Sequence, residues 1–356
     1  MAGRRIMMGL MLAAALPPSP QVFPCPLSAG WDVVRTVKLP RKGLDGQPVG
    51  GFSAAGYQPE QDRLWLLSDS PRSYLMPWGG LARLLRGEAS ALTPGARLRL
   101  RTAQGDALPV GLDGEGLVLQ GNQAWIVSEG RRTKRRQASL IRFDLATGRL
   151  MQRRPLPASW AATRGGGLAV NLGPESLTTL APGDLLMAAE APLLQERMHG
   201  GIPLARSHPD GQAEPYAWLR LASLGADAGL TDLLAVPAAQ RLLALVRQVS
   251  FPFGWQAWLV AFPLSPSTRD AHRPLMHWDL HTAGLPADNW EALTLGPQLP
   301  DGRFTLVLAS DDNFSPLQMN WLAVLAPRRG KACLSRRRLN PVQGLGRVPE
   351  KRLSRG

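Results

Sequence analysis

Short apolar segments bounded by Gly or Pro recur along this chain and alternate with polar turns. Five stretches share one pattern: a small or polar residue, a short apolar strand, a Pro or Gly turn, and a second apolar strand that ends in a polar residue. These stretches are residues 50–69, 113–129, 173–190, 229–247 and 289–314. Apolar runs of this length between turn residues are typical of buried β-strands. The pattern therefore predicts an all-β protein built from repeats.

The polar positions of these repeats recur at a nearly constant spacing. The first polar position of each repeat is followed by the next after 62, 60, 57 and 59 residues. These first positions are Ser53, Glu115, Glu175, Asp232 and Glu291. The second strands end at Asp69, Glu129, Glu190, Arg247 and Asp311. Eight of these ten positions are acidic, and chance does not readily produce two such columns with one period, so they mark a repeated structural unit.

A period near 60 residues leaves room for four short strands in each repeat. Further apolar segments follow the shared pair of strands, and in the first repeat we expect them at "LARLL" and "ARLRLRT". Four antiparallel strands repeated radially form the blade of a β-propeller. The sequence therefore predicts a propeller with five blades. Six blades are the alternative if the long segment 70–111 is organised differently.

The last repeat lacks a fourth strand, whereas a lone apolar strand, 31–39, precedes the first repeat. We expect 31–39 to pair antiparallel with 319–327, because this closes the ring and leaves no exposed edge strand. Cys25 lies six residues before the first of these strands and Cys333 lies six residues after the second. The two cysteines are therefore expected to form a disulfide across the closure, with two free thiols as the alternative.

The two ends of the chain differ in composition from the repeats. Residues 1–15 combine two arginines with an apolar run, which is typical of a secretory signal peptide; the twin-arginine route is an alternative to the general one. We expect an extension over 16–30, the propeller over 31–330 and a basic, disordered tail over 331–356. No internal apolar run approaches the ~20 residues that a transmembrane helix needs. These features predict an exported monomer, in the periplasm or outside the cell.

The net charge of +14 does not indicate a nucleic-acid partner. Residues 328–356 hold ten Lys and Arg and only one acidic residue, so they carry +9 of this charge. Five more Lys and Arg lie in the run 131–136. A uniformly basic face is therefore not expected, and we expect no nucleic acid as partner. The run 131–136 follows Glu129 and is a candidate guide for a phosphorylated small-molecule substrate, with a solvated loop as the alternative.

Both acidic columns should meet at one face of a propeller. In a blade the first strand leaves one face along the central channel, and the second strand returns to that face. Carboxylates packed around this mouth raise each other's pKa unless a cation lies among them. Ca²⁺ prefers such oxygen ligands, and we expect Ca²⁺ or another divalent cation there. The candidate metal ligands are Asp69, Glu115, Glu129, Glu175, Glu190, Asp232, Glu291 and Asp311.

The repeats resemble a family of secreted bacterial proteins, "esterase-like activity of phytase". The resemblance lies in "NWEALTLGP", "LVLASDDNF", "DGEGLVL" and "GLTDLLAV" and covers roughly residues 50–325. It implies a phytase-like propeller that hydrolyses phosphomonoesters or phosphodiesters. The site residues that it implies are Glu115, Glu129, Glu175, Glu190, Asp232, Glu291, Asp311 and Asp312. At Arg247 the chain departs from the acidic pattern and places a cation in the ring.

Three roles stay open for the ring carboxylates: metal binding, general acid–base catalysis, and acceptance of backbone N–H bonds that lock adjacent blades. The candidate catalytic residues are Glu291, Asp311, Asp312, Glu115 and Arg247, the last as a phosphate clamp or as an internal counter-ion. We expect His277 and His281 on an outer strand rather than in a zinc site. No Gly-x-Ser-x-Gly elbow is present, so a serine hydrolase is not expected. A non-catalytic exported propeller that binds a ligand or protein is the alternative to the hydrolase.

Overall fold

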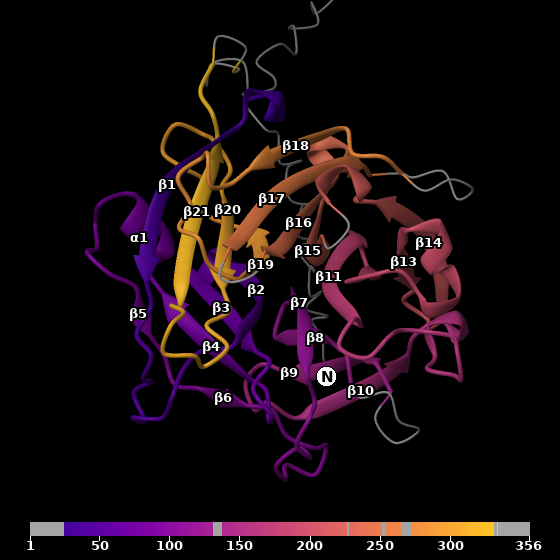
Figure 1. Cartoon of the computed structure of the whole chain (residues 1–356). Coiled ribbons are helices and arrows are strands. Elements are labelled where there is room, and N and C mark those ends of the chain that lie inside the picture. The colour runs from indigo at the N-terminus through magenta and orange to yellow at the C-terminus, as the bar shows by residue number, and fades with distance from the viewer. Residues whose placement is uncertain are drawn as a thin grey trace, which may run out of the picture.

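The computed structural model describes residues 25–130, 137–225, 228–250, 254–264, 272–330 and 333. Five antiparallel sheets are arranged radially around a common centre (Figure 1). This arrangement confirms the all-β propeller and its five blades. The expected signal peptide, 1–15, the basic run 131–136 and nearly all of the tail lie outside the described residues.

Each blade has its first strand at the centre and its later strands outside it. Blade 1 contains β2 (Phe52–Gln58), β3 (Arg63–Ser68), β4 (Tyr74–Gly79), β5 (Thr93–Pro94) and β6 (Leu98–Arg99). Blade 2 contains β7 (Gly114–Gln120), β8 (Gln123–Ser128), β9 (Ser139–Asp144) and β10 (Leu150–Pro155). Blade 3 contains β11 (Pro174–Ala181), β12 (Asp184–Ala189), β13 (Gly201–Ser207) and β14 (Ala213–Arg220). Blade 4 contains β15 (Gly229–Val236), β16 (Arg241–Ser250), β17 (Gly254–Pro263) and β18 (Met276–Asp279).

Blade 5 closes the ring with strands from both ends of the described chain. It contains β19 (Trp290–Leu295), β20 (Leu306–Ser310), β21 (Trp321–Pro327) and the N-terminal β1 (Trp31–Lys38). β1 and β21 pair antiparallel, with Trp31 opposite Pro327 and Lys38 opposite Trp321. A disulfide joins Cys25 to Cys333, and their Cα atoms are 4.0 Å apart. Both the predicted strand pairing and the predicted disulfide are therefore confirmed.

Helices are short and lie between the strands. The α-helix is α1 (Leu81–Leu85), and the 3₁₀ helices are η1 (Leu27–Ala29), η2 (Pro59–Gln61), η3 (Ala158–Trp160), η4 (Leu194–His199), η5 (Ala222–Leu224) and η6 (Pro237–Ala239). None of the helices in the described part of the chain is long and apolar enough to span a membrane.

The prediction that "LARLL" forms a strand is wrong, because this segment is α1. Gly80 has φ +88°, which ends β4 and turns the chain into the helix. Asp62 then accepts the N–H of Ala82 at 2.7 Å, which satisfies one of the unpaired donors at the helix start. The helix buries Leu81 and Leu84, which are three residues apart and so lie on one side. The third strand of blade 1 is therefore β4, and the short β5 and β6 both pair with it.

The hydrophobic core lies between adjacent blades. One cluster joins Phe52 and Leu64 of blade 1 to Val307 of blade 5, and corresponding clusters lie at the other blade interfaces. A blade has apolar residues on both faces, so it can bury them only by stacking on two neighbours. Each first strand also contacts the first strands of both neighbouring blades. This packing fixes the five first strands against one another at the centre.

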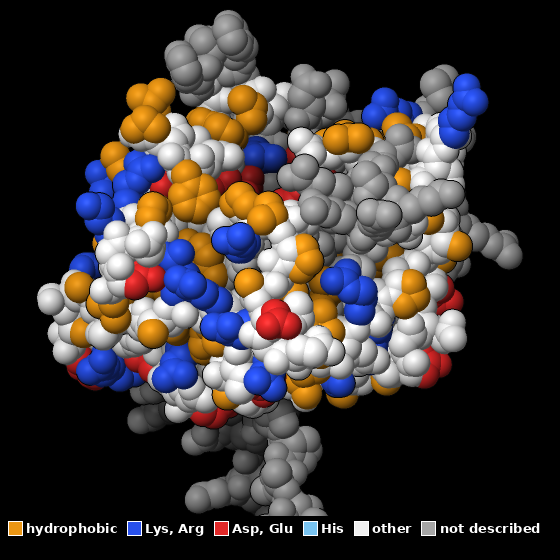
Figure 2. All heavy atoms as spheres, turned by 90° about the horizontal axis from the view of Figure 1, so that it is seen from below, with side chains coloured by type: hydrophobic (Ala, Val, Ile, Leu, Met, Phe, Trp, Pro, Cys, Tyr) orange, Lys and Arg blue, Asp and Glu red, His pale blue; other side chains and the backbone are white. Residues whose placement is uncertain are grey.

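Charged side chains are spread over the outside of the propeller. Figure 2 views the molecule from the side that carries β6, β9 and β10 at the lower edge of Figure 1. Lys and Arg side chains on this side are separated by uncharged and apolar surface. Arg97, next to β6, has its guanidinium carbon 4.2 Å from the centroid of the Tyr74 ring.

Candidate functional site

The first strand of every blade carries a β-bulge near its start. The bulge residues, at which the pairing register with the second strand shifts, are Ser53, Glu115, Glu175, Thr231 and Glu291. A bulge leaves one residue outside the regular ladder and redirects its side chain. Four of these residues belong to the first predicted column. In blade 4 the structure places Thr231, and not Asp232, at the equivalent position.

Asp232 has a different environment from the bulge carboxylates. One oxygen accepts the N–H of Leu233 at 2.8 Å, and the other accepts the N–H of Leu293 in the neighbouring first strand at 2.6 Å. Burial raises the pKa of Asp232, and the opposing contributions come from these two backbone bonds rather than from a charged side chain. Asp232 therefore links blades 4 and 5, which is the structural role that the sequence left open for such carboxylates.

The bulge hydroxyls also link neighbouring blades. Ser53 donates to the carbonyl of Gly114 at 2.7 Å, and Thr231 donates to the carbonyl of Trp290 at 3.2 Å. Each acceptor directly precedes the bulge residue of the next blade. By contrast, the carboxylates of Glu115 and Glu175 form no hydrogen bond with another described residue. These two bulge carboxylates are therefore not used to link neighbouring blades.

The ends of the second strands are held at the entrance of each blade. We define the entrance residue as the one that lies two positions before the bulge. N–H groups at the ends of the second strands donate to entrance carbonyls at 2.8–2.9 Å, in the pairs Asp69–Gly51, Glu129–Asp113, Glu190–Gly173 and Asp311–Asn289. This repeated contact, and in blade 4 the pairing of Arg247 with the entrance residue Gly229, place the second column around the start of the first strands, which we call the mouth.

Side chains of the second column reach the entrance of the next blade. Glu129 accepts the N–H of Gly173 at 2.7 Å, across the interface of blades 2 and 3. Arg247 donates to the side-chain oxygen of Asn289 at 2.5 Å, across the interface of blades 4 and 5. At the interface of blades 5 and 1, Asp312, which follows the column residue Asp311, accepts the N–H of the entrance residue Gly51. At each of these three interfaces a side chain thus hydrogen-bonds to the entrance residue of the next blade, although the side chains are chemically different.

Arg247 is the cation of the acidic mouth. Its guanidinium donates to Glu291 at 2.7 Å and to Glu190 at 3.0 Å, so it joins blades 3, 4 and 5. Burial lowers the pKa of Arg247, but the neighbouring carboxylates outweigh this effect and raise it. Its side chain is 21% exposed, so part of it faces solvent. Arg247 is thus an internal counter-ion that a ligand at the mouth can reach.

Asp312 is held in a separate ion pair. Its carboxylate lies 3.1 Å from the guanidinium of Arg41 and accepts the N–H of Gly51 at 3.0 Å. Arg41 also donates to the carbonyl of Ser315 at 2.7 Å. The Asp312 side chain is 1% exposed. These contacts give the predicted catalytic Asp312 a position that anchors blade 5 to blade 1.

Five other carboxyl groups at the mouth have raised pKa values and so favour their protonated forms. Burial and the charge of Asp311 raise the pKa of Asp69 to about 8, and burial with the charge of Glu291 raises that of Asp311 to about 8. Burial raises the pKa of Glu291 to about 7, although Arg247 opposes this. Burial and neighbouring carboxylates also raise the pKa values of Glu115 and Glu175. The mouth therefore keeps several protons near neutral pH.

The donor set of the mouth suits Ca²⁺ in kind but not in arrangement. Carboxylate oxygens are the ligands that this ion takes. Among the described residues, however, no three His, Cys, Asp or Glu side chains lie close enough to share one ion. Arg247 already contacts two of the candidate ligands, Glu190 and Glu291. The expectation of Ca²⁺ stays a prediction, and we derive no reaction step through a metal.

Of the two histidines expected on an outer strand, one lies in it and the other, His281, lies in the turn that follows. His277 lies in β18. The ring nitrogens of His281 lie 2.7 Å from the carbonyl oxygen of Trp255 and 3.1 Å from that of Leu285. His281 therefore connects β17 with the segment that leads to blade 5.

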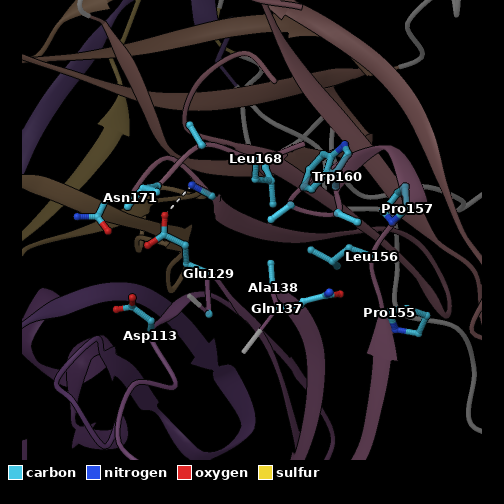
Figure 3. Close-up of a pocket in the computed structure, with 16 residues that line it drawn as sticks. Asp113, Glu129, Gln137, Ala138, Pro155, Leu156, Pro157, Trp160, Leu168 and Asn171 are labelled. Atoms are coloured by element: carbon cyan, nitrogen blue, oxygen red, sulfur yellow. Dashed lines mark hydrogen bonds between the residues drawn. The ribbon is translucent and has the colours of Figure 1, made fainter. Parts of the chain in front are cut away.

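A pocket of about 550 Å³ lies beside the mouth, between blades 2 and 3. Figure 3 shows the carboxyl groups of Asp113 and Glu129 at one end and Leu156, Trp160 and Leu168 at the other. The sequence analysis missed this pocket, Asp113 and Asn289. A signal for the last two was present, because the residues two positions before the bulges are Gly51, Asp113, Gly173, Gly229 and Asn289. All are residue types that favour turns.

The chain is similar to several solved structures at low sequence identity. The chain resembles the Cellvibrio cellulosa alpha-L-arabinanase, with 12% identity, a TM-score of 0.42, and coverage of 81% of this chain and 95% of that chain. It also resembles a member of the DUF4221 family from Bacteroides vulgatus, with 10% identity, a TM-score of 0.40, and coverage of 82% and 81%. The β-propeller domain of Cps50 (Swd1) from Myceliophteria thermophila is matched with 11% identity, a TM-score of 0.35, and coverage of 78% and 66%.

The sequence itself identifies the family. No curated protein matches the chain. A family model described as "Phytase-like: Esterase-like activity of phytase" matches residues 47–314, from the entrance of blade 1 to the end of the second strand of blade 5. The match covers more than half of the chain and includes every bulge residue of the mouth. The chain therefore belongs to the phytase-like family named for the esterase-like activity of phytase.

Proposed function

We propose that this phytase-like propeller hydrolyses phosphoesters at its mouth. The observation that carries the proposal is Arg247, which Glu190 and Glu291 hold beside carboxyl groups that keep their protons near neutral pH. A guanidinium is well suited to bind phosphoryl oxygens. A carboxyl group with a pKa near the working pH can donate a proton to a leaving group. Arg247 and the carboxyl groups together supply these two requirements of phosphoester cleavage.

The proposal assigns different roles to the members of the mouth. Arg247 binds the phosphoryl group and stabilises the negative charge that develops on it. Glu291 and Asp311 are the candidates for the general acid, because their pKa values are about 7 and about 8. Glu115 and Glu175 are candidates for orienting water, since neither carboxyl group forms a hydrogen bond with another described residue.

The acidity of the mouth sets a condition on this reaction. Ionised carboxylates repel a phosphoester anion, so the substrate can approach only when they are protonated or when a cation screens them. A divalent cation would supply this screening. We therefore expect hydrolysis either at acidic pH or in the presence of a divalent cation.

A substrate panel tests the proposal. Purified protein is assayed with p-nitrophenyl phosphate and bis-p-nitrophenyl phosphate between pH 4 and pH 9, with Ca²⁺ or with a chelator. We expect turnover that increases at acidic pH or requires Ca²⁺. Folded protein that turns over neither ester under any of these conditions would contradict the proposal.

Export is the second part of the proposal. The disulfide between Cys25 and Cys333 supports it, because such bonds persist in oxidising compartments. We propose that the protein acts in the periplasm or outside the cell, where phosphoesters from the medium reach it. Fractionation of the producing cells should find the protein outside the cytoplasm with this disulfide intact.

A further inference from the structure

Phe314 is an exposed aromatic residue beside the mouth. It lies in the loop that joins β20 to β21, shortly after the acidic pair Asp311 and Asp312. The residue is 40% exposed, whereas Phe is among the residue types that are most often buried. Exposure alone would need no explanation, because single apolar residues occur on many protein surfaces. The backbone of this loop, however, shows that the ring is held in place at a cost.

The backbone that carries this ring is strained. Asn313 has a φ of +46° and Phe314 has a φ of +49°. Asn tolerates this left-handed region, but a residue as bulky as Phe rarely adopts it. Strain of this kind persists only where the surrounding contacts enforce it, and it is concentrated at functional sites.

The two acids of this loop enforce the strained conformation. The carboxylate of Asp311 accepts the N–H of Asn313 at 2.7 Å, and that of Asp312 accepts the N–H of Phe314 at 3.1 Å. The carbonyl of Asp312 also accepts the N–H of Ser315 at 2.7 Å. Two carboxylates that belong to the mouth and to its blade 5–1 interface thus fix the backbone of the exposed ring.

The ring lies against the entrance of blade 1. A Cβ atom added to Gly51 would lie 2.7 Å from Cε2 of Phe314 and would also clash with the carboxyl group of Asp69. The absence of a side chain at Gly51 therefore leaves the space in which the ring and this carboxyl group meet. Because Asp69 belongs to the second column, the ring lies at the rim of the mouth.

A chain of hydrogen bonds connects this part of the rim to Arg247. Arg247 donates to the side-chain oxygen of Asn289 at 2.5 Å, and the side-chain nitrogen of Asn289 donates to Asp311 at 3.3 Å. Asp311 in turn holds the backbone of Asn313, which directly precedes Phe314. The guanidinium and the ring therefore both border the mouth, and Asn289 and Asp311 connect them.

From this arrangement we propose that Phe314 is a specificity residue of the mouth and that the preferred substrates are phosphoesters with an aromatic organic group. The inference rests on the proposed function, because it takes Arg247 as the site of the phosphoryl group. Aromatic rings attract each other in offset-stacked or edge-to-face pairs. An aryl group that extends from the bound phosphoryl group is stabilised by Phe314 in this way, whereas a methyl group is too small to make the contact.

Two phosphonates that cannot be hydrolysed test the inference without turnover. Isothermal titration calorimetry compares phenylphosphonate with methylphosphonate at pH 5, where Asp69, Glu291 and Asp311 keep their protons because their pKa values are about 7 to about 8. We expect the wild type to bind phenylphosphonate at least fivefold more tightly. Equal affinity for the two would overturn the inference and leave the phosphoryl site at Arg247 in place. If neither phosphonate binds, the phosphoryl site and the inference are both contradicted.

Variants of the ring locate the contact. Phe314→Ala should bring the two affinities within twofold of each other, and Phe314→Tyr should keep the preference because it retains the ring. Met151→Ala is the control, since it truncates an apolar residue that is 48% exposed in β10, the outer strand of blade 2. Methylphosphonate should bind all of these proteins alike, because none of the changes alters Arg247. A preference for phenylphosphonate that survives Phe314→Ala would place the aryl group elsewhere and overturn the inference.

Discussion

At the scale of single residues, the two acidic columns have different roles. The second column follows the second strands directly in four blades and contacts the blade entrances, and in blade 4 Arg247 lies inside β16, which continues to Ser250. The bulge column supplies Glu115, Glu175 and Glu291 to the mouth. The sequence predicted both columns but assigned Asp232 where the structure has Thr231. Thr231 and Asp232 are adjacent and both polar, so the spacing of the repeats alone does not show which of them occupies the bulge. The hydrogen bond from Thr231 to Trp290 in the next blade shows the correct alignment.

The Glu129–Gly173 contact can be tested through the glycine. A Cβ atom at position 173 would lie 2.3 Å from Cγ of Glu129, which is closer than two such atoms can approach. Gly173→Ala should therefore destabilise the protein by about 1–3 kcal/mol, the usual cost of overpacking. Gly330→Ala is the control, because nothing lies within 4 Å of the added Cβ. Urea denaturation measures both, and equal stability of the two variants would contradict the contact.

The pH dependence of stability tests the crowding of carboxyl groups. Because the pKa of Asp69 is about 8 in the folded protein and about 3.9 when unfolded, the folded state binds the proton more tightly. The resulting stabilisation is complete below pH 4 and is lost as the pH rises through 8. Asp69→Asn should remove this loss, so the variant should exceed the wild type in unfolding free energy at pH 8.5. A wild-type protein that gains stability between pH 5 and pH 8 would argue against the shift.

At the scale of elements, the pattern of apolar residues predicted most strands correctly. It was wrong where an apolar segment can form either a strand or a helix. The segment "LARLL" is as apolar as a buried strand, but Gly80 and the Asp62 contact at the helix start favour a helix. The true third strand of blade 1, β4, contains Pro77 and so resembles a loop in the sequence. The closure of the ring was predictable because the last repeat lacked a fourth strand and a lone strand, 31–39, preceded the first repeat. Burial depth and charge environment at the mouth depend on tertiary packing, which the sequence pattern does not reveal.

The disulfide across the closure should stabilise blade 5. It joins residues separated by 308 positions, so it restricts the unfolded chain strongly. Cys333→Ser should lower the free energy of unfolding by on the order of 4–5 kcal/mol in the chain-entropy account. Denaturation of the variant and of the wild type, each with and without reductant, measures the effect. A wild-type protein that reductant leaves unchanged would show that the bond does not stabilise the closure.

At the scale of the whole molecule, the ring brings distant residues to one place. Arg247 of blade 4 meets Glu190 of blade 3 and Glu291 of blade 5 only because consecutive blades stack around the centre. The propeller therefore concentrates carboxyl groups at its mouth and, among the described residues, places the guanidinium of Arg247 between two of them. Asp301 offers a contrast, because it lies in the turn between β19 and β20 at the other end of these strands and pairs with Arg303 and Arg329.

The most direct test of the proposed reaction centre compares Arg247→Gln with Asp301→Asn on the phosphoester that the wild type cleaves best. Both variants remove a charged partner of an ion pair, but only Arg247 lies at the mouth. Circular dichroism confirms that both are folded before kcat/KM is measured. We expect Arg247→Gln to lower kcat/KM about 100-fold, because a charged donor to the transition state is lost, and Asp301→Asn to leave it within about twofold of the wild type. Folded Arg247→Gln protein with wild-type kcat/KM would show that Arg247 does not bind the phosphoryl group.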